Sequence, residues 1–259
     1  MTHWLIPAWP DLPPNIGALS TTRQGGVSVT PYDDGSSAAG GMNLGTHVGD
    51  RPEAVQRNRA LLRAVLPAEP LWLAQVHGTR VVDAALATGV PEADASFTSE
   101  RGVVCTVQTA DCLPVLLCDS DGTTVGAAHA GWRGLVAGVL ENTVACMRAA
   151  GAGEIVAWLG PAIGPMHFEV GEDVRQAFVA RFVDLGHSAD QARAAFRPIA
   201  DSTGKYLADI YLLARSALMQ VGVTRVSGGD LCTVSDARRF YSYRRDRVTG
   251  RMASLIWIN

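Results

Sequence analysis

Short β-type segments that occur in pairs around tight turns are the feature that most constrains the fold of this chain. Pro114–Cys118 and Thr123–Ala128 are separated by Asp119-Ser120-Asp121-Gly122, a run of turn-forming residues. Two β-type segments joined by such a turn form an antiparallel hairpin. Further β-type runs are Leu71–Val76, Val81–Ala84, Val103–Val107, Ile155–Leu159, Val223–Ser227 and Met252–Ile258. The sequence therefore predicts mixed, largely antiparallel sheets.

Four segments with helical periodicity are interspersed among these β-type runs. They are Pro52–Leu66, Gly134–Ala150, Glu172–Val183 and Lys205–Val221. Asp50 is a candidate cap for the first, and Gly151 is a suitable stop for the second. Gly35–Gly41 reads as a surface loop. Because helices and strands do not alternate as βαβα, the sequence predicts an α+β fold in a single domain spanning residues 1–259, with helices covering the sheets.

Composition excludes several classes of protein. With 47% hydrophobic and 18% charged residues the chain resembles a globular rather than a disordered protein. A net charge of −3 gives no overall basic field, so nucleic acid is not an expected partner. The mixed aromatic and arginine segment Phe240–Asp246 is more typical of a solvated strand edge than of a nucleic-acid surface.

The sequence also predicts the cellular setting. No apolar run approaches the roughly 18 residues that a membrane span needs, and the prolines in Met1–Pro14 argue against a secretory signal. Five cysteines without the spacing of a small disulfide scaffold favour reduced thiols and a cytoplasmic protein. Neither a heptad seam nor a large apolar stripe predicts a dimer, so a monomer is expected.

A candidate metal site follows from the predicted hairpin. Cys112 opens its first strand and His129 ends its second, so both lie at the same end of the sheet, while His77 ends a third β-type run. One thiolate and two imidazoles suit Zn²⁺, and three protein ligands leave the fourth position open for water or substrate. However, a lone cysteine before an apolar strand is more often a buried small hydrophobe. A lone histidine at a strand end is more often a satisfied or exposed side chain, so the residues alone leave both interpretations open.

Arg133 is a candidate anion-binding residue. It lies in a Gly-Trp-Arg-Gly turn at the start of the predicted helix Gly134–Ala150. Free N–H groups and the helix dipole favour an anion there, and a guanidinium can bind phosphate with two hydrogen bonds. The alternative interpretation is a surface salt bridge.

Motifs spread along nearly the whole chain resemble those of a known family. They lie at Leu19–Ser28, Asn43–Asp50, Gln75–Gly78, Gln108–Pro114, His129–Gly134, Tyr241–Asp246 and Thr249–Met252. In this order they are similar to those of the YfiH-like family, also described as laccase-domain or multicopper polyphenol oxidase-like proteins. The resemblance implies a layered α/β/β/α fold similar to the catalytic domain of a cytotoxic necrotising factor. It also implies a catalytic Zn²⁺ held by His77, Cys112 and His129.

The activity implied by the resemblance is purine nucleoside phosphorolysis of adenosine, inosine and methylthioadenosine, with an adenosine deaminase side activity. The candidates to hold phosphate are Arg23, Arg133 and Arg244. Asn43 and His47 are candidates to bind ribose or base. Asp111 is a candidate to orient a ligand imidazole. For Asn43 and Asp111, turn capping is the alternative interpretation.

The laccase description and two other functions compete with this interpretation. A trinuclear copper cluster needs many histidines, typically in His-x-His pairs, whereas this chain has six histidines and no such pair. A single copper ion remains compatible with two histidines and a cysteine, so a copper-binding polyphenol oxidase is one alternative. Another is a metal-free hydrolase of an amide, with Cys112 as nucleophile and His129 as its base. A third is a non-enzymatic metal-binding module.

Overall fold

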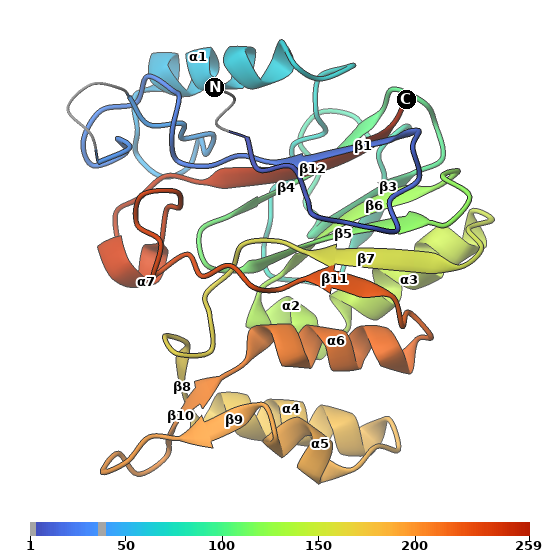
Figure 1. Cartoon of the computed structure of the whole chain (residues 1–259), viewed down its shortest axis with the longest axis vertical. Coiled ribbons are helices and arrows are strands. Elements are labelled where there is room, and N and C mark those ends of the chain that lie inside the picture. The colour runs from blue at the N-terminus through green and yellow to red at the C-terminus, as the bar shows by residue number, and fades with distance from the viewer. Residues whose placement is uncertain (1–3, 36–39) are drawn as a thin grey trace.

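Two stacked β-sheets occupy the middle of the computed structural model, which describes residues 4–35 and 40–259 (Figure 1). The larger sheet has the strand order β11-β7-β5-β6-β3-β2, and the smaller has the order β1-β12-β4. The larger consists of β2 (Val81–Asp83), β3 (Ala95–Thr98), β5 (Leu113–Asp119), β6 (Val125–Ala130), β7 (Ile155–Leu159) and β11 (Val226–Gly228). The smaller consists of β1 (Ile16–Ser20), β4 (Val104–Thr109) and β12 (Met252–Ile258). Only the pairs β2–β3 and β7–β11 are parallel among these strands, which confirms the predicted mixed, largely antiparallel sheets.

The central strand β5 is buried on both faces. Leu116 and Cys118 pack between the two sheets, whereas Val115 and Leu117 belong to the core on the opposite side. Alternate residues of a strand point to opposite faces, so a strand covered on both sides reads as a continuous apolar run. This explains why β5 shows no alternation of polar and apolar residues.

Helices cover the outer faces of both sheets, as Figure 1 shows. α1 (Pro52–Arg63) packs against the smaller sheet through Leu62. The larger sheet is covered by α2 (Trp132–Ala137), α3 (Val139–Ala149) and α6 (Ile210–Gln220). The order of layers is therefore α/β/β/α, as predicted. Within the described ranges, no helix is long and apolar enough to cross a membrane.

A further layer lies beyond α6 (Figure 1). It contains α4 (Glu172–Asp184), α5 (Ala189–Arg193) and a small antiparallel sheet of β8 (Glu169–Gly171), β10 (Lys205–Ala208) and β9 (Phe196–Pro198). The short helix α7 (Tyr243–Asp246) precedes β12. The aromatic and arginine segment of the sequence is therefore this helical turn with its flanks, and not a strand edge.

The predicted helix Gly134–Ala150 is wrong in its continuity. Gly138 adopts the left-handed conformation (φ 102°) and separates α2 from α3. Its N–H caps α2 by donating to the Gly134 carbonyl. The stop at Gly151, which has φ 99°, agrees with the end of α3 at Ala149.

The predicted helix Lys205–Val221 is wrong in its first part. Lys205–Ala208 is β10, which pairs with strands on both sides. The helix begins after Asp209, whose side chain accepts a hydrogen bond from the Leu212 N–H. Tertiary pairing and this cap together override the apparent periodicity.

Leu71–Val76 is not a strand, although strand pairing was predicted. Only Leu71 and Ala74 form isolated bridges. The Gln75 side chain replaces the missing ladder, because its amide accepts from the Gln108 N–H (2.8 Å) and donates to the Gln108 carbonyl (2.9 Å). A side-chain amide thereby joins this segment to β4.

Two smaller predictions concern the N-terminal half. Asp50 does not cap α1, because the N-cap residue is Arg51 and the Asp50 carboxylate accepts from Ser28 and Asn43. The centre of the predicted loop Gly35–Gly41, residues 36–39, lies outside the described residues. Gly40 and Gly41 at its end form bridges with Gly26 and Ser28.

Candidate active site

The β5–β6 hairpin brings two of the predicted metal ligands to one end of the larger sheet. Its register pairs Leu113 with Ala130 and Pro114 with His129, which places Cys112 beside His129. His77 reaches them from a loop, with its Nε2 3.7 Å from the Cys112 Sγ. The three ligand atoms lie within 4.8 Å of one another. Among the described residues, this is the only group of three or more such side chains that can hold a metal ion.

Asp94 is the central supporting residue of this site, and the sequence analysis missed it. Its fully buried carboxylate accepts from the His129 Nδ1 at 2.8 Å and from the backbone N–H groups of His77 (2.9 Å) and Gly78 (2.6 Å). The bond to Nδ1 leaves the Nε2 of His129 free to bind a metal. One carboxylate therefore orients one ligand and holds the loop that carries another.

Asp111 does not have the role that was predicted for it. Its carboxylate accepts from the Thr233 Oγ1 (2.5 Å) and the Arg244 N–H (2.6 Å), and not from an imidazole. It anchors the segment around α7 beside the cysteine ligand instead. Asp111 and His77 are also non-glycine residues with positive φ, 94° and 61° respectively. Such conformations cost about 1–3 kcal/mol each and persist only where the surrounding contacts enforce them.

Gly131 makes the close approach of the ligands possible. A Cβ atom at this position would lie 2.8 Å from the His77 Cδ2 and 3.0 Å from the Cys112 Sγ. Any side chain would displace one of these two ligands. The three donors, the oriented imidazole and this glycine together fit a single bound metal ion.

The electrostatics favour a thiolate at this site. Burial opposes ionisation of the Cys112 thiol, but the charge of His129 and hydrogen bonds from His129 and His77 outweigh it and lower the pKa to about 6. Burial likewise opposes the charged form of His129, but the charge of Cys112 and the hydrogen bond to Asp94 raise its pKa to about 9. Without metal the pair is therefore a thiolate and an imidazolium at neutral pH. The thiolate is the form that binds metals.

In the metal-free protein, we expect iodoacetamide to alkylate Cys112 with a rate that rises with pH through about 6. An unperturbed thiol would show this rise near about 8.5. Peptide mass spectrometry after timed reactions between about pH 4.5 and 9 measures the rate. Cys146, also partly buried but with its pKa raised by burial, is the internal control and should react slowly at neutral pH. A Cys112 profile that matched that of Cys146 would contradict the prediction.

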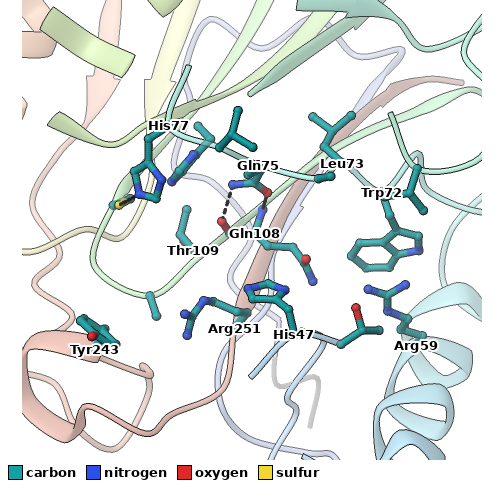
Figure 2. Close-up of a pocket in the computed structure, with 17 residues that line it drawn as sticks. His47, Arg59, Trp72, Leu73, Gln75, His77, Gln108, Thr109, Tyr243 and Arg251 are labelled. Atoms are coloured by element: carbon teal, nitrogen blue, oxygen red, sulfur yellow. Dashed lines mark hydrogen bonds between the residues drawn. The ribbon is translucent and has the colours of Figure 1, made fainter. Parts of the chain in front are cut away.

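Two cavities meet at these residues. The larger has a volume of about 750 Å³, within the range of small-molecule sites, and the smaller has about 240 Å³. Both are lined by His77, Ala110, Cys112 and Tyr243. Figure 2 shows the larger cavity extending from His77 towards His47, Arg59 and Trp72. The two cavities therefore adjoin at the candidate metal ligands His77 and Cys112.

Comparison with known proteins identifies the family. The family described as "multi-copper polyphenol oxidoreductase laccase" matches residues 17–259. The chain belongs to this YfiH-like family. It is 52% identical to the purine nucleoside phosphorylase YfiH of Escherichia coli K12 over the full length of both chains. It is 53% identical to a purine nucleoside phosphorylase of Pseudomonas aeruginosa, covering 100% of this chain and 99% of that protein.

Solved structures of similar chains have the same fold. A Neisseria meningitidis protein with 48% identity aligns over all of both chains with a TM-score of 0.86. YlmD of Geobacillus stearothermophilus, with 30% identity, covers 100% of this chain and 97% of its own with a TM-score of 0.82. The α+β architecture with mixed sheets is therefore that of the YfiH-like family.

Arg133 and Arg244 of this YfiH-like chain line the smaller cavity together. The Arg133 guanidinium lies 4.5 Å from the centre of the Trp132 ring, and it forms no ion pair with any residue that the structure describes. The Arg244 guanidinium donates to the Glu169 carbonyl at 3.1 Å. The helix here spans Trp132–Ala137, so Arg133 lies in its first turn, and the predicted helix start at Gly134 is two residues too late.

Arg23 and Asn43 line neither of these cavities, which contradicts the roles predicted for them. The Arg23 guanidinium donates to the carbonyls of Asp33 and Ala237. The fully buried Asn43 accepts from the Gly45 and Arg251 N–H groups. The hydrogen-bonding groups of both side chains are thus paired with backbone groups of neighbouring loops. His47, in contrast, does line the larger cavity.

Several residues of the larger cavity were not predicted from the sequence, above all Arg59 and Arg251. Arg251 is part of the Thr249–Met252 motif, so the motif itself was the available signal. Arg59 lies on α1, where an arginine between apolar positions looks like an ordinary solvent-exposed helix residue. Only the folded chain brings α1 to the cavity.

Proposed function

We propose that this chain is a zinc-dependent purine nucleoside phosphorylase acting on adenosine, inosine and methylthioadenosine. The observation that carries the proposal is the meeting of two cavities at His77 and Cys112. The larger has room for a nucleoside, and the smaller is lined by Arg133 and Arg244, which suit phosphate. The names of the relatives from Escherichia coli and Pseudomonas aeruginosa support the same reaction.

The metal that fits this donor set best is zinc. Two imidazoles and a thiolate are three protein ligands, the number that leaves a fourth coordination position open in catalytic zinc sites. A bound zinc ion supplies Lewis acidity, which lowers the pKa of water to about 7 or polarises an oxygen atom. Two histidines and a cysteine can also bind a single copper ion. A multicopper relay does not fit, because the described part of the chain offers no second cluster of such ligands.

The protein's own residues would act mainly by positioning. Arg133 and Arg244 would hold phosphate on one side of the metal centre, with the nucleoside in the larger cavity on the other side. A phosphate oxygen then bonds to C1′ while the bond from C1′ to the purine nitrogen breaks. The bonding electrons leave with the purine, which takes up a proton. His47 would contact the nucleoside, since it lines that cavity.

Adenosine deamination is a second proposed activity of the same centre, in which a metal ion held by His77, Cys112 and His129 would activate the water that replaces the C6 amino group, and that group would take up a proton and leave as ammonia. The proposed enzyme is a cytoplasmic monomer whose partners are purine nucleosides and inorganic phosphate. Five free cysteines, with Cys105 and Cys118 buried, are compatible with a reducing compartment.

Product analysis tests the proposed reaction. Purified protein with a measured zinc content is incubated with adenosine in the presence and absence of phosphate. We expect adenine and ribose 1-phosphate only when phosphate is present, with about one zinc ion per chain. Inosine formed equally with and without phosphate, and no adenine, would leave a zinc deaminase instead.

Arg133→Ala is expected to raise the KM for phosphate by roughly 10–100-fold, because charge-assisted hydrogen bonds contribute about 1.5–3 kcal/mol. Deamination of adenosine should change far less, since it uses no phosphate. Initial rates of both reactions over a range of phosphate concentrations measure the difference. Arg148→Ala, an exposed arginine in the last turn of α3, is the control. Equal losses in both reactions would assign Arg133 to nucleoside binding or to the fold.

A metal-free cysteine hydrolase is the second candidate function. Cys112, His129 and Asp94 form a nucleophile, a base and an orienting carboxylate, in the order that cysteine hydrolases use. The lowered pKa of Cys112 favours this candidate. Amide hydrolysis that persists after complete removal of zinc, and stops on alkylation, would establish it.

A further inference from the structure

A cationic group of side chains lines the larger cavity from the neighbourhood of Tyr243 to its end at Trp72. We define this cationic end by Arg59, Arg251 and His47, which all line that cavity. Figure 2 shows His47 between the two arginines, with Trp72 over Arg59. The side chains come from α1, from the loop before it and from the residue that precedes β12. The fold therefore brings the positive charges of two arginines from distant segments into one cavity, with the imidazole of His47 between them.

The two arginines lack carboxylate partners. Neither forms an ion pair within the described ranges, and no acidic residue lines the larger cavity. Arg59 donates from Nε to the Leu44 carbonyl (3.0 Å), and Arg251 donates from Nη1 to the carbonyls of Thr249 (3.2 Å) and Gly250 (3.1 Å). Both side chains are partly buried, an environment where charged groups are normally paired. The remaining N–H groups are available for an anion.

Charge and shape agree with an anion at this place. Burial lowers the pKa of His47, and the charges of Arg251 and Arg59 lower it further, so both guanidinium groups act at the same imidazole. The guanidinium carbon of Arg59 lies 3.8 Å from the centre of the Trp72 ring, which fixes its plane. Glu69, the acidic residue whose charge acts on Arg59, accepts a hydrogen bond from the Trp72 Nε1.

We propose that the cationic end binds the phosphate monoester of a purine nucleoside 5′-monophosphate, which is then a substrate of this enzyme. The inference rests on the proposed function, because it takes the nucleoside to occupy the larger cavity. Inorganic phosphate has its own candidate position at Arg133 and Arg244, across the metal centre. An anion at the cationic end is therefore best supplied by the nucleoside itself.

The reaction is the same displacement with a phosphorylated sugar. An oxygen of inorganic phosphate bonds to C1′ as the bond from C1′ to the purine nitrogen breaks. The electron pair goes to the purine, which takes up one proton. The products are the free purine and ribose 1,5-bisphosphate, and neither an oxidant nor a further reactant is needed.

Binding measurements test the subsite independently of turnover. Calorimetric titration of the zinc-loaded protein in phosphate-free buffer compares adenosine with adenosine 5′-monophosphate, and ribose with ribose 5-phosphate. We expect each phosphorylated compound to bind at least about tenfold more tightly than its parent, because charge-assisted hydrogen bonds to two arginines are gained. Equal affinities within each pair would overturn the proposal.

Variants assign the effect to the cationic end. Arg59→Gln and Arg251→Gln should each remove most of the preference for the phosphorylated compounds, and Arg59→Lys should keep part of it. Arg57→Gln, an exposed residue two positions away on α1, should keep all of it. Thermal unfolding of each variant shows whether a loss reflects unfolding. A preference unchanged in both Gln variants would overturn the assignment.

Steady-state kinetics distinguish a nucleotide subsite from a site for free phosphate. Turnover of adenosine 5′-monophosphate with a higher kcat/KM than adenosine, reduced in Arg59→Gln, supports the proposal. A rise in the KM for inorganic phosphate in Arg59→Gln, with adenosine as substrate, would overturn it, because the subsite would then belong to free phosphate. If no nucleoside or nucleotide reacts but the binding preference depends on Arg59, the proposed function fails and the subsite stands.

Discussion

Replacing Cys112 with alanine is expected to leave the protein without zinc and without measurable phosphorolysis of adenosine. The change removes the one anionic ligand of the centre, whose thiolate is held by His129 and His77. Zinc content should fall from about one ion per chain to roughly a tenth or less. Elemental analysis of the purified variant, together with an adenine release assay, measures both effects. His77→Ala and His129→Ala should behave in the same way.

The control for this prediction is Cys146→Ala. Cys146 is also partly buried, but it lies on α3 and is not part of the metal-binding group. It should keep its zinc and its activity. A Cys112→Ala protein with full phosphorolysis would end the metal hypothesis, and one that keeps zinc but loses activity would point to the thiolate as nucleophile.

Replacing Asp94 with asparagine is expected to lower the affinity for zinc by about 10–100-fold, the usual effect of losing a carboxylate that orients a ligand imidazole. The amide also places an NH2 group against the N–H donors of His77 and Gly78 or against that of His129. At least one buried donor then loses its acceptor, so the free energy of unfolding should fall by about 2 kcal/mol. Chelator competition and thermal unfolding measure the two effects.

Substitutions of two further aspartates serve as controls for Asp94→Asn. Asp111→Asn changes a buried carboxylate that contacts no imidazole, so its effect on zinc affinity should be smaller than that of Asp94→Asn. Asp121→Asn, in the exposed β5–β6 turn, should change neither quantity. If Asp94→Asn and Asp111→Asn weakened zinc binding equally, the specific role of Asp94 would be disproved.

Local sequence was sufficient to predict those parts of the fold whose contacts are between residues close in the chain. The turn at residues 119–122 sets the β5–β6 hairpin, and the hairpin alone brings Cys112 to His129. The covering of the sheets by helices followed from the mixture of hairpins and helices, whereas the α/β/β/α order of layers was implied by the family resemblance. The sequence pattern failed where distant pairing decides, as in Lys205–Ala208, which is a strand only because β8 and β9 lie on either side of it.

The candidate site shows the same contrast between features set by local sequence and features set by long-range contacts. The two ligands on the hairpin follow from local sequence, whereas the support that Asp94 gives to His129 spans 35 residues. No local signal marked Asp94, because the segment Pro91–Ser96 mixes proline, small and acidic residues and looks like a surface turn. The prediction that Asn43 binds ribose or base failed because the sequence does not show how its amide is paired. Its polar side chain is fully consumed inside the fold, which the sequence does not reveal.

The three ligands differ in how firmly the fold holds them, and this sets the path of metal exchange. Cys112 and His129 are fixed to neighbouring strands of the larger sheet, whereas His77 is exposed on a loop that lacks a continuous strand partner. The hairpin thus supplies two ligands from a rigid support, and His77 supplies the third from the solvent-exposed side. We expect the ion to enter and leave on the side of His77, the exposed ligand, while Asp94 keeps the His77 loop in place through its N–H groups. An apo form should therefore keep its fold and reload rapidly, so that metal supply in the cell can set how much of the enzyme is active.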